Sequence, residues 1–373
     1  MIARTIVKGL LSLGLVFVLL LGAGLIYRAW LLRQSEKALK IPGPVGIDEA
    51  MFIKIGGTWQ WITIRGRDRA NPVVLMIHGG PGASNGAFSV ELLPFEKEFT
   101  VVQWDQPGTA KSFAHAGGRI EADLTIDGVA EGGIQVAEFL KTHLHRDRII
   151  LLGWSWGSIV GVEMARKRLD LFAAYVGTGQ IVNEQAGEAI SYAKVLAIAR
   201  ARGDRQAVKE LEAGPPPYKK LADVGTQRKW SSIYAGDPAP AVQFTRFALL
   251  APRYSLGDAW SYISGFMASQ NHFLGPNLEG EFMKVDLTAG NMAFALPVFI
   301  IQGAEDVWTP AALSRTFVDK LTAPEKAFIP IEGAGHEALV RNTPEFLKAM
   351  RERVRPIAGA RSSDPSIPVS VRE

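Results

Sequence analysis

The chain has 373 residues, 47% apolar and 21% charged, which is typical of a globular protein with one enlarged α/β domain or two domains. It has no cysteine, which excludes disulfides, thiolate zinc sites and a cysteine nucleophile. The formal net charge is +4, but residues 1–40 carry +5 and residues 41–373 sum to −1. The globular part therefore gives no electrostatic argument for binding nucleic acid.

An uncharged segment near the N-terminus, Gly9–Tyr27, has 19 residues and is long enough to cross a bilayer as a helix. Basic residues flank both of its ends. The competing interpretation is a cleaved signal peptide, whose apolar region would be about 7–15 residues long. Because the run here is longer, we expect residues 1–40 to form an uncleaved single-pass membrane anchor. Such an anchor most often leaves the domain that follows it outside the cytoplasm.

Runs of apolar or alternating residues bounded by turn residues predict eight strands, at Met51–Ile55, Trp59–Arg65, Val73–Ile77, Phe99–Trp104, Ile149–Leu152, Phe172–Val176, Leu296–Gln302 and Lys326–Ile331. Helical spacing of apolar residues predicts helices at Thr125–His143, from near Gly157 onward, and at Pro310–Leu321 and Pro344–Val354. Strands that alternate with helices indicate an α/β fold, with a mostly parallel central sheet and helices on both faces.

The alternation stops between about residues 180 and 290, where the sequence is helical, loop-like and rich in aromatics. An insertion that leaves after one strand and returns to the next is expected over the carboxyl edge of the sheet, where α/β proteins bind ligands. We therefore predict a core of residues 41–180 and 291–356, a helical lid at 181–290, and a flexible polar tail at 357–373.

The centre of the chain is the sequence G-W-S-W-G at Gly153–Gly157, which matches G-x-S-x-G between a predicted strand and a predicted helix. That motif places a serine on a sharp turn, and the flanking glycines leave room for Ser155 to project as a nucleophile. Free N–H groups at the start of the following helix would stabilise a developing oxyanion. The alternative is an ordinary strand-to-helix turn in which the serine caps the helix.

A serine nucleophile needs a base, and the base needs an acid that orients it. Asp306 and His336 follow the last two predicted strands, in glycine-containing loops and in the chain order Ser, Asp, His that this motif favours. Glu305 is the alternative acid. His78 is expected to hold its own glycine-rich loop. The H-x-H spacing at positions 143 and 145 is a weak metal signal, and we expect no metal and no cofactor.

Several motifs together resemble the proline iminopeptidase-like group of α/β-hydrolases: H-G-G-P-G at His78–Gly82, D-Q-P-G at Asp105–Gly108, G-W-S-W-G-S at Gly153–Ser158, G-x-x-D at Gly303–Asp306, and Gly335-His336. The resemblance implies the α/β-hydrolase fold, with Ser155 as nucleophile, His336 as base and Asp306 as its orienter. It also implies an oxyanion hole formed by the backbone N–H groups of Gly80 and Trp156, and the position of these residues agrees with that role.

The chain departs from the family at two places. Pro107 stands where the family usually has an arginine. In the lid, Tyr234 stands where the family often has a glutamate that holds the free amine of the substrate. Other lid acids are available for that role, namely Glu184, Glu188 and Asp237, and nothing in the sequence selects one.

We therefore expect a membrane-anchored serine hydrolase that cleaves a small apolar ester, amide or short peptide-like substrate. Its partners are then that substrate and, through the N-terminal helix, the lipid bilayer, with no nucleic acid. The first alternative is an authentic proline iminopeptidase, which needs a counter-charge for the substrate amine. The second is a catalytically silent binding protein with a hydrolase fold.

Overall fold

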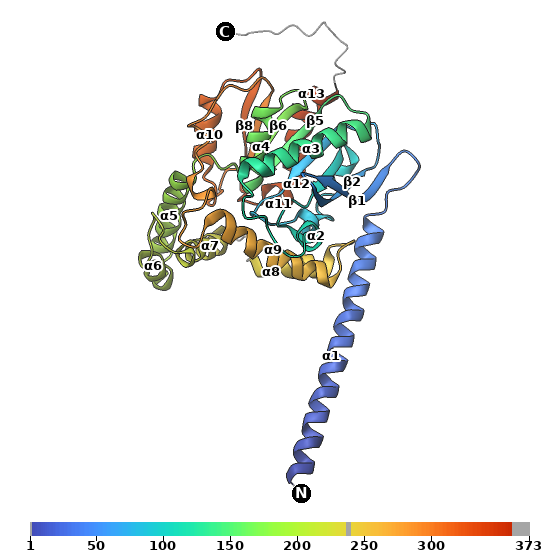
Figure 1. Cartoon of the computed structure of the whole chain (residues 1–373). Coiled ribbons are helices and arrows are strands. Elements are labelled where there is room, and N and C mark those ends of the chain that lie inside the picture. Colours follow the sequence, from blue (N-terminus) through green and yellow to red (C-terminus); the bar gives the residue numbers. More distant parts are fainter. Residues whose placement is uncertain (1, 236–239, 360–373) are drawn as a thin grey trace.

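The computed structural model describes residues 2–235 and 240–359, and Figure 1 shows a single α/β body from which one long helix projects. This helix, α1 (Ile2–Ala38), is unbroken, and the apolar side chains along its outer part are exposed. Within the described residues it is the one helix long and apolar enough to cross a membrane.

An eight-stranded sheet forms the centre of the body, with the spatial order β1-β2-β4-β3-β5-β6-β7-β8. The first two strands pair in antiparallel fashion, β2 is antiparallel to β4, and every further pairing is parallel. The strands are β1 (Ile47–Ile55), β2 (Thr58–Gly66), β3 (Val73–Ile77), β4 (Thr100–Trp104), β5 (Ile149–Trp154), β6 (Phe172–Thr178), β7 (Val298–Gly303) and β8 (Lys326–Ile331). The predicted mostly parallel sheet and all eight predicted strands are confirmed, with ends that shift by up to four residues.

The continuous apolar runs of the central strands arise because both faces of the sheet are buried. In β3, Val73, Leu75 and Ile77 point into one hydrophobic core, whereas Val74 and Met76 point into the other. Helices α3 (Ile126–Leu144), α4 (Trp156–Lys167) and α10 (Ala311–Lys320) contribute to the first core. Helices α11 (Ala338–Arg341) and α12 (Thr343–Ala349), with the π turn η4 (Met350–Val354), contribute to the second.

Shorter elements connect the strands. They are η1 (Asn85–Phe88), η2 (Phe95–Lys97) and α2 (Ala110–His115). The last described element, α13 (Arg355–Gly359), enters the segment predicted to be a flexible tail, and the remainder of that segment lies outside the described residues.

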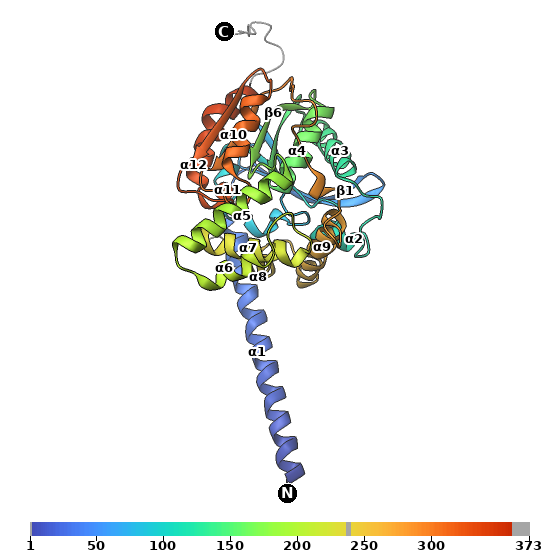
Figure 2. The same cartoon turned by 90° about the vertical axis from the view of Figure 1, so that its left-hand side faces the viewer.

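The segment between β6 and β7 forms a cluster of helices at the end of the body toward which α1 extends (Figures 1 and 2). Its elements are α5 (Glu184–Ala201), α6 (Arg205–Glu212), α7 (Leu221–Ala235), α8 (Pro240–Leu250), α9 (Leu256–Leu274) and η3 (Phe282–Lys284). Helices α5, α6 and α7 share a small core of their own. Helix α9 packs instead on the sheet side, where Ser269 Oγ donates a hydrogen bond to the Gly108 carbonyl at 3.1 Å.

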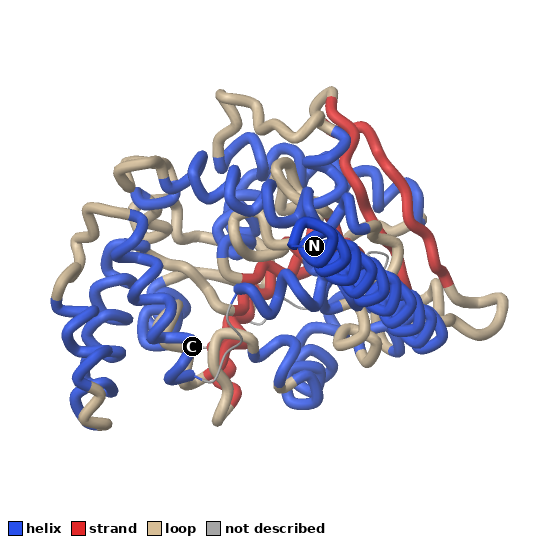
Figure 3. The backbone as a smooth tube through the Cα atoms, turned by 90° about the horizontal axis from the view of Figure 1, so that it is seen from below, coloured by secondary structure: helices blue, strands red, loops and turns tan. Residues whose placement is uncertain are grey.

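Helix α1 is attached to this helical cluster near the point where it leaves the body. Arg28 Nε donates to the Ala248 carbonyl at 2.7 Å, and Arg28 Nη2 donates to the Tyr254 carbonyl at 2.9 Å. Figure 3 shows the molecule from below, with the N-terminal end of the projecting helix toward the viewer. The C-terminal part of α1 is therefore attached to α8 and to the loop that precedes α9.

Candidate active site

Ser155 occupies a strained turn between β5 and α4, with φ 55° and ψ −122°. A positive φ is unfavourable for a residue with a Cβ and persists only where its surroundings enforce it. The glycines on either side are required by space: a Cβ on Gly157 would lie 2.1 Å from the Ile77 carbonyl oxygen, and one on Gly153 would lie 2.5 Å from the Gly157 oxygen. Ser155 is at the N-cap position of α4, but its side chain makes no capping hydrogen bond. The geometry thus does not support the helix-cap interpretation.

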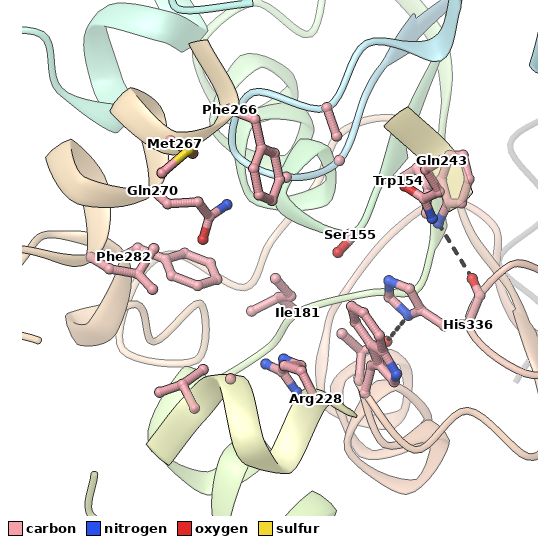
Figure 4. Close-up of a pocket in the computed structure, with 18 of the residues that line it drawn as sticks. Trp154, Ser155, Ile181, Arg228, Gln243, Phe266, Met267, Gln270, Phe282 and His336 are labelled. Atoms are coloured by element: carbon pink, nitrogen blue, oxygen red, sulfur yellow. Dashed lines mark hydrogen bonds between the residues drawn. The ribbon is translucent and has the colours of Figure 1, made fainter. Parts of the chain in front are cut away.

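The two candidate partners of Ser155 lie together at the same edge of the sheet. Asp306 follows β7 and His336 follows β8, and His336 Nδ1 is 3.0 Å from Asp306 Oδ2. Both side chains are buried, whereas the neighbouring Glu305 is exposed. In Figure 4 the ring of His336 and the Ser155 hydroxyl point toward each other, and both residues line a pocket. The structure therefore brings together Ser155, Asp306 and His336. Burial distinguishes the two adjacent acids, because Asp306 is buried beside His336 and Glu305 faces solvent.

The Asp306 carboxylate is held by a dense set of donors. Oδ1 accepts from the backbone N–H groups of Trp308 at 2.8 Å and Thr309 at 3.0 Å, and Oδ2 accepts from Thr309 Oγ1 at 2.6 Å. Burial alone would raise the pKa of this carboxyl, but the adjacent His336 and the hydrogen bonds from His336 and Thr309 outweigh it and lower the pKa below its usual value. Asp306 is therefore ionised at neutral pH and can fix the imidazole so that Nδ1 carries a proton.

The position of the His336 ring is further restricted by contacts that the sequence did not reveal. The Trp308 indole stacks on the imidazole, with ring centroids 5.1 Å apart. Trp154 Nε1 donates to the His336 carbonyl at 3.3 Å. A Cβ on Gly179 would lie 2.7 Å from His336 Cε1, so the backbone of that residue packs directly against the ring. The only sequence signal for the Trp308 contact was its position two residues after Asp306.

The loop after β3 borders Ser155 on the other side. Gly79 approaches so closely that a Cβ there would lie 3.2 Å from Ser155 Cβ, and Gly80 has φ 120° and lines the pocket. Trp156 is the first residue of α4, directly after Ser155. The two residues predicted to form the oxyanion hole, Gly80 and Trp156, thus flank the nucleophile candidate on two different elements.

His78 connects the two glycine-containing loops and does not face the nucleophile candidate. The Gln106 backbone N–H donates to His78 Nε2 at 3.2 Å, and His78 Nδ1 lies 2.8 Å from the Gly79 carbonyl oxygen. Burial lowers the pKa of His78 to about 4, so the ring is neutral and can donate from Nδ1 while it accepts at Nε2. Trp156 Nε1 in turn donates to Gln106 Oε1 at 3.0 Å, which connects these loops to α4.

A pocket with a volume of about 410 Å³ lies over Ser155. The side chains that line it are mainly apolar, and helices of the 181–290 segment supply much of the wall (Figure 4). Residues from that segment include Ile181, Val224, Phe244, Phe266, Met267 and Phe282. The volume and apolar lining are those of a site for a small organic ligand.

A charged cluster borders the pocket: Glu184 and Arg228 line the wall, and Glu188 lies behind them. Arg228 forms an ion pair with Glu188 and lies 3.8 Å from Glu184 Oε1. Burial and the neighbouring Glu188 raise the pKa of Glu184 well above its usual value, although Arg228 acts in the opposite direction. Arg228 therefore lies between two buried carboxyls at this wall.

Tyr234, which the sequence placed at the amine-binding position, does not line the pocket. Its hydroxyl donates to Asp204 Oδ2 at 3.1 Å, on the face of α7 that packs against α5 and α6. Arg228, which lines the pocket, and Tyr234 are six residues apart on α7, so their side chains point about 120° apart around the helix. Of the other candidate acids, Glu184 lines the pocket, Glu188 lies behind it, and Asp237 lies outside the described residues.

A buried carboxyl beside the pocket, Asp105, joins three segments of the chain. Ser84 Oγ donates to Asp105 Oδ1 at 2.6 Å, the Lys111 backbone N–H donates to Oδ2 at 3.2 Å, and the Tyr254 hydroxyl approaches both oxygens at 3.1–3.2 Å. Burial raises the pKa of Asp105 to about 7, against the effect of these donors. Asp105 thus connects the loop after β3 to the segment that precedes α9.

Comparison with known proteins agrees with this geometry. The family described as the alpha/beta hydrolase fold matches residues 72–343. A probable aminopeptidase from Bacillus subtilis is 28% identical over 324 residues, which are 84% of this chain and 99% of that protein. A proline iminopeptidase from Lactobacillus delbrueckii subsp. bulgaricus is 23% identical over 304 residues, with 79% of this chain and 94% of that protein covered.

Among solved structures, that of the proline iminopeptidase from Mycobacterium smegmatis superposes with a TM-score of 0.60 at 16% sequence identity. The match covers 83% of this chain and 99% of that one. At this identity the likeness establishes the shared fold.

Proposed function

Because the chain belongs to the α/β-hydrolase fold family and resembles proline iminopeptidases within it, we propose that it is a membrane-anchored serine hydrolase. Its substrate is a small apolar ester, amide or peptide-like molecule, which it cleaves through an acyl-enzyme. The observation that carries this proposal is the 3.0 Å contact between His336 Nδ1 and the buried Asp306, at the wall of the same pocket into which Ser155 opens.

In this proposal each residue has one chemical task. Ser155 Oγ attacks the substrate carbonyl carbon while His336 Nε2 takes its proton, and Asp306 stabilises the imidazolium that forms. The negative charge on the former carbonyl oxygen is stabilised by the N–H groups of Gly80 and Trp156, an effect typically worth about 3–4 kcal/mol for each donor. His336 then returns the proton to the departing alcohol or amine. A water molecule activated by His336 hydrolyses the acyl-enzyme and restores Ser155.

The runner-up is an N-terminal aminopeptidase of the proline iminopeptidase type. It is supported by the names of the relatives and by Glu184, a carboxyl that lines the pocket. It requires an anion for the substrate ammonium, and here Glu184 shares Arg228 with Glu188. The broader hydrolase activity does not need that anion and is therefore favoured. A silent binding protein is the least favoured, because no member of the Ser-Asp-His set is missing.

We propose further that α1 is an uncleaved single-pass anchor and that the catalytic body lies outside the cytoplasm. The support is the unbroken helix through the small residues Gly22–Gly24, where a signal peptide would be cut, and the attachment of Arg28 to α8. The 19 uncharged residues that precede Arg28 extend about 28 Å as a helix, close to the thickness of the hydrocarbon core.

A fluorophosphonate probe tests the proposed activity directly. The wild-type protein should be labelled and should turn over a short-chain ester. Ser155→Ala should lose both properties with little change in thermal stability. The matched control is Ser264→Ala, because among the described residues that hydroxyl bonds only to the Trp260 carbonyl of its own helix, at 2.8 Å. Undiminished labelling of Ser155→Ala would refute the assignment of the nucleophile.

A further inference from the structure

The outer face of α9 carries an apolar stripe that nothing in the described chain covers. Leu256, Trp260 and Met267 are 48%, 70% and 59% exposed, and Ile263 lies between them half-buried. The spacing i, i+4, i+7, i+11 places all four side chains on one side of the helix. The opposite side holds the buried residues Tyr262, Gly265, Ser269 and Phe273. An aligned row of this kind is unusual on a surface that faces water.

The stripe begins where the proposed membrane span ends. Arg28, the first charged residue after the uncharged run, donates to the carbonyl of Tyr254, two residues before Leu256. The aromatic rings of Tyr27 and Trp30 stack beside it at 5.9 Å, and both are more than half exposed. Tyrosine, tryptophan and arginine at this position are typical of the boundary between the hydrocarbon and the headgroups. The boundary is therefore at the level of the start of α9.

The far end of the stripe opens into the pocket over Ser155. Met267 is exposed on the stripe and also lines the pocket. Its neighbours Phe266 and Gln270 line the pocket as well (Figure 4). An apolar chain that leaves a surface in contact with Trp260 and Ile263 would thus pass Met267 and enter the pocket without crossing water. The interior beyond this opening is apolar, with Leu274 and Phe282 on its wall.

We propose that the stripe Leu256–Met267 lies on the surface of the bilayer that α1 spans, and that the enzyme takes substrates which partition into that bilayer. This inference rests on the proposed hydrolase activity and specifies its substrate class: an amphiphile with an apolar chain and a scissile ester or amide near its polar end. The bilayer contact concentrates such substrates at the mouth of the pocket, whereas water-soluble substrates of the same chemistry gain nothing from the stripe.

A label placed on the stripe tests the contact without any use of activity. Because the chain has no cysteine, Trp260→Cys creates a single attachment site for an environment-sensitive fluorophore. Leu169→Cys is the matched control, since Leu169 is 45% exposed in the loop before β6, at the amino end of the strands. The full chain is reconstituted in vesicles of phosphatidylethanolamine and phosphatidylglycerol. Brominated lipids should quench the label at 260 several-fold more than the label at 169, and equal quenching would refute the contact.

Two substrates with one leaving group test the substrate class in the same vesicles. 4-Methylumbelliferyl butyrate is soluble, and 4-methylumbelliferyl oleate partitions into the bilayer. Trp260→Glu should reduce turnover of the oleate about tenfold or more and leave turnover of the butyrate unchanged, whereas Leu169→Glu should alter neither. Unchanged oleate turnover in Trp260→Glu would overturn the inference while the hydrolase assignment stands. Absence of turnover with both esters in the wild type would instead overturn the proposed function.

Discussion

The imidazole of His336 stacks on the indole of Trp308, with ring centroids 5.1 Å apart and an angle of 17° between their planes. Trp308 also contacts the Arg228 guanidinium, which lies 5.2 Å from an indole ring centroid. The stack fixes the plane of the imidazole, and Asp306 fixes its rotation within that plane. We expect Trp308→Leu to lower kcat about tenfold with little change in KM on a short-chain ester. Trp308→Phe, which keeps a ring, should retain most of the activity, and equal losses in both variants would show that stacking is not the cause.

The choice between two adjacent acids gives the second prediction. Asp306→Asn keeps the volume of the side chain but offers an amide to His336, so the imidazole loses the tautomer that can accept the Ser155 proton. Turnover should fall by about four orders of magnitude, as expected for removal of the orienting acid from such a triad. The control is Glu305→Gln, which should change turnover less than twofold because Glu305 is exposed. The opposite ranking would mean that the other acid orients His336.

The charged cluster on the pocket wall gives the third prediction. Because Glu184 and Glu188 share Arg228, a free α-amino group on the substrate should bring little benefit. The measurement compares a proline arylamide whose amine is free with the same compound acetylated. A ratio of kcat/KM below about 100 is expected, which corresponds to less than about 2.7 kcal/mol. A larger ratio that disappears in Glu184→Gln would establish the aminopeptidase alternative.

The attachment of α1 gives the fourth prediction. Full-length protein should remain with membranes through high-salt and alkaline washes, because a spanning helix is not released by either treatment. A truncated chain that starts near Ile41 should be soluble and active on a short-chain ester, since the residues of the pocket all lie beyond that point. If the mature protein instead begins near residue 25 and washes off, the segment is a signal peptide.

The buried carboxyl of Asp105 gives the fifth prediction. Its pKa is about 7 in the folded chain and close to 3.8 when unfolded, so the folded state binds more protons between those values. The contribution of Asp105 to the free energy of unfolding is therefore lost as the pH rises from about 4 to 7. The loss is about 1.4 kcal/mol for each unit of difference between the two pKa values. The difference in melting temperature between Asp105→Asn and wild type should grow in favour of the variant up to pH 7 and then level off. The exposed Asp123→Asn should show no such trend.

The fold was predictable because its signals are local and periodic. Buried strands such as β3 are continuous apolar runs, and the glycines around Ser155 mark a turn that no other residue permits. The order of Ser155, Asp306 and His336, and the position of each directly after a predicted strand, led to the prediction that they meet, since parallel strands end at one edge of the sheet. These features depend on sequence neighbours alone.

Contacts that depend on how a helix is rotated about its axis could not be predicted from the sequence. The position of Tyr234 outside the pocket could not be predicted, because the face of α7 that points inward is set by packing against α5 and α6. The Arg228 cluster and the stacking of Trp308 on His336 join residues that are 40 and 28 positions apart. Such pairs form when separate elements pack against each other, and the spacing of residues along the chain does not predict them.

The two hydrogen bonds of Arg28 also couple the tilt of α1 to the position of the helices that it contacts. A spanning helix adjusts its tilt to the thickness of the surrounding hydrocarbon. Here Arg28 of that helix donates to the carbonyls of Ala248 in α8 and of Tyr254 in the short connection between α8 and α9. The Tyr254 hydroxyl reaches Asp105, and α8 and α9 both line the pocket. If α1 spans a membrane as proposed, a thicker or thinner bilayer would pull on two helices that line the pocket, and a change in the lipid would reach the entrance to Ser155.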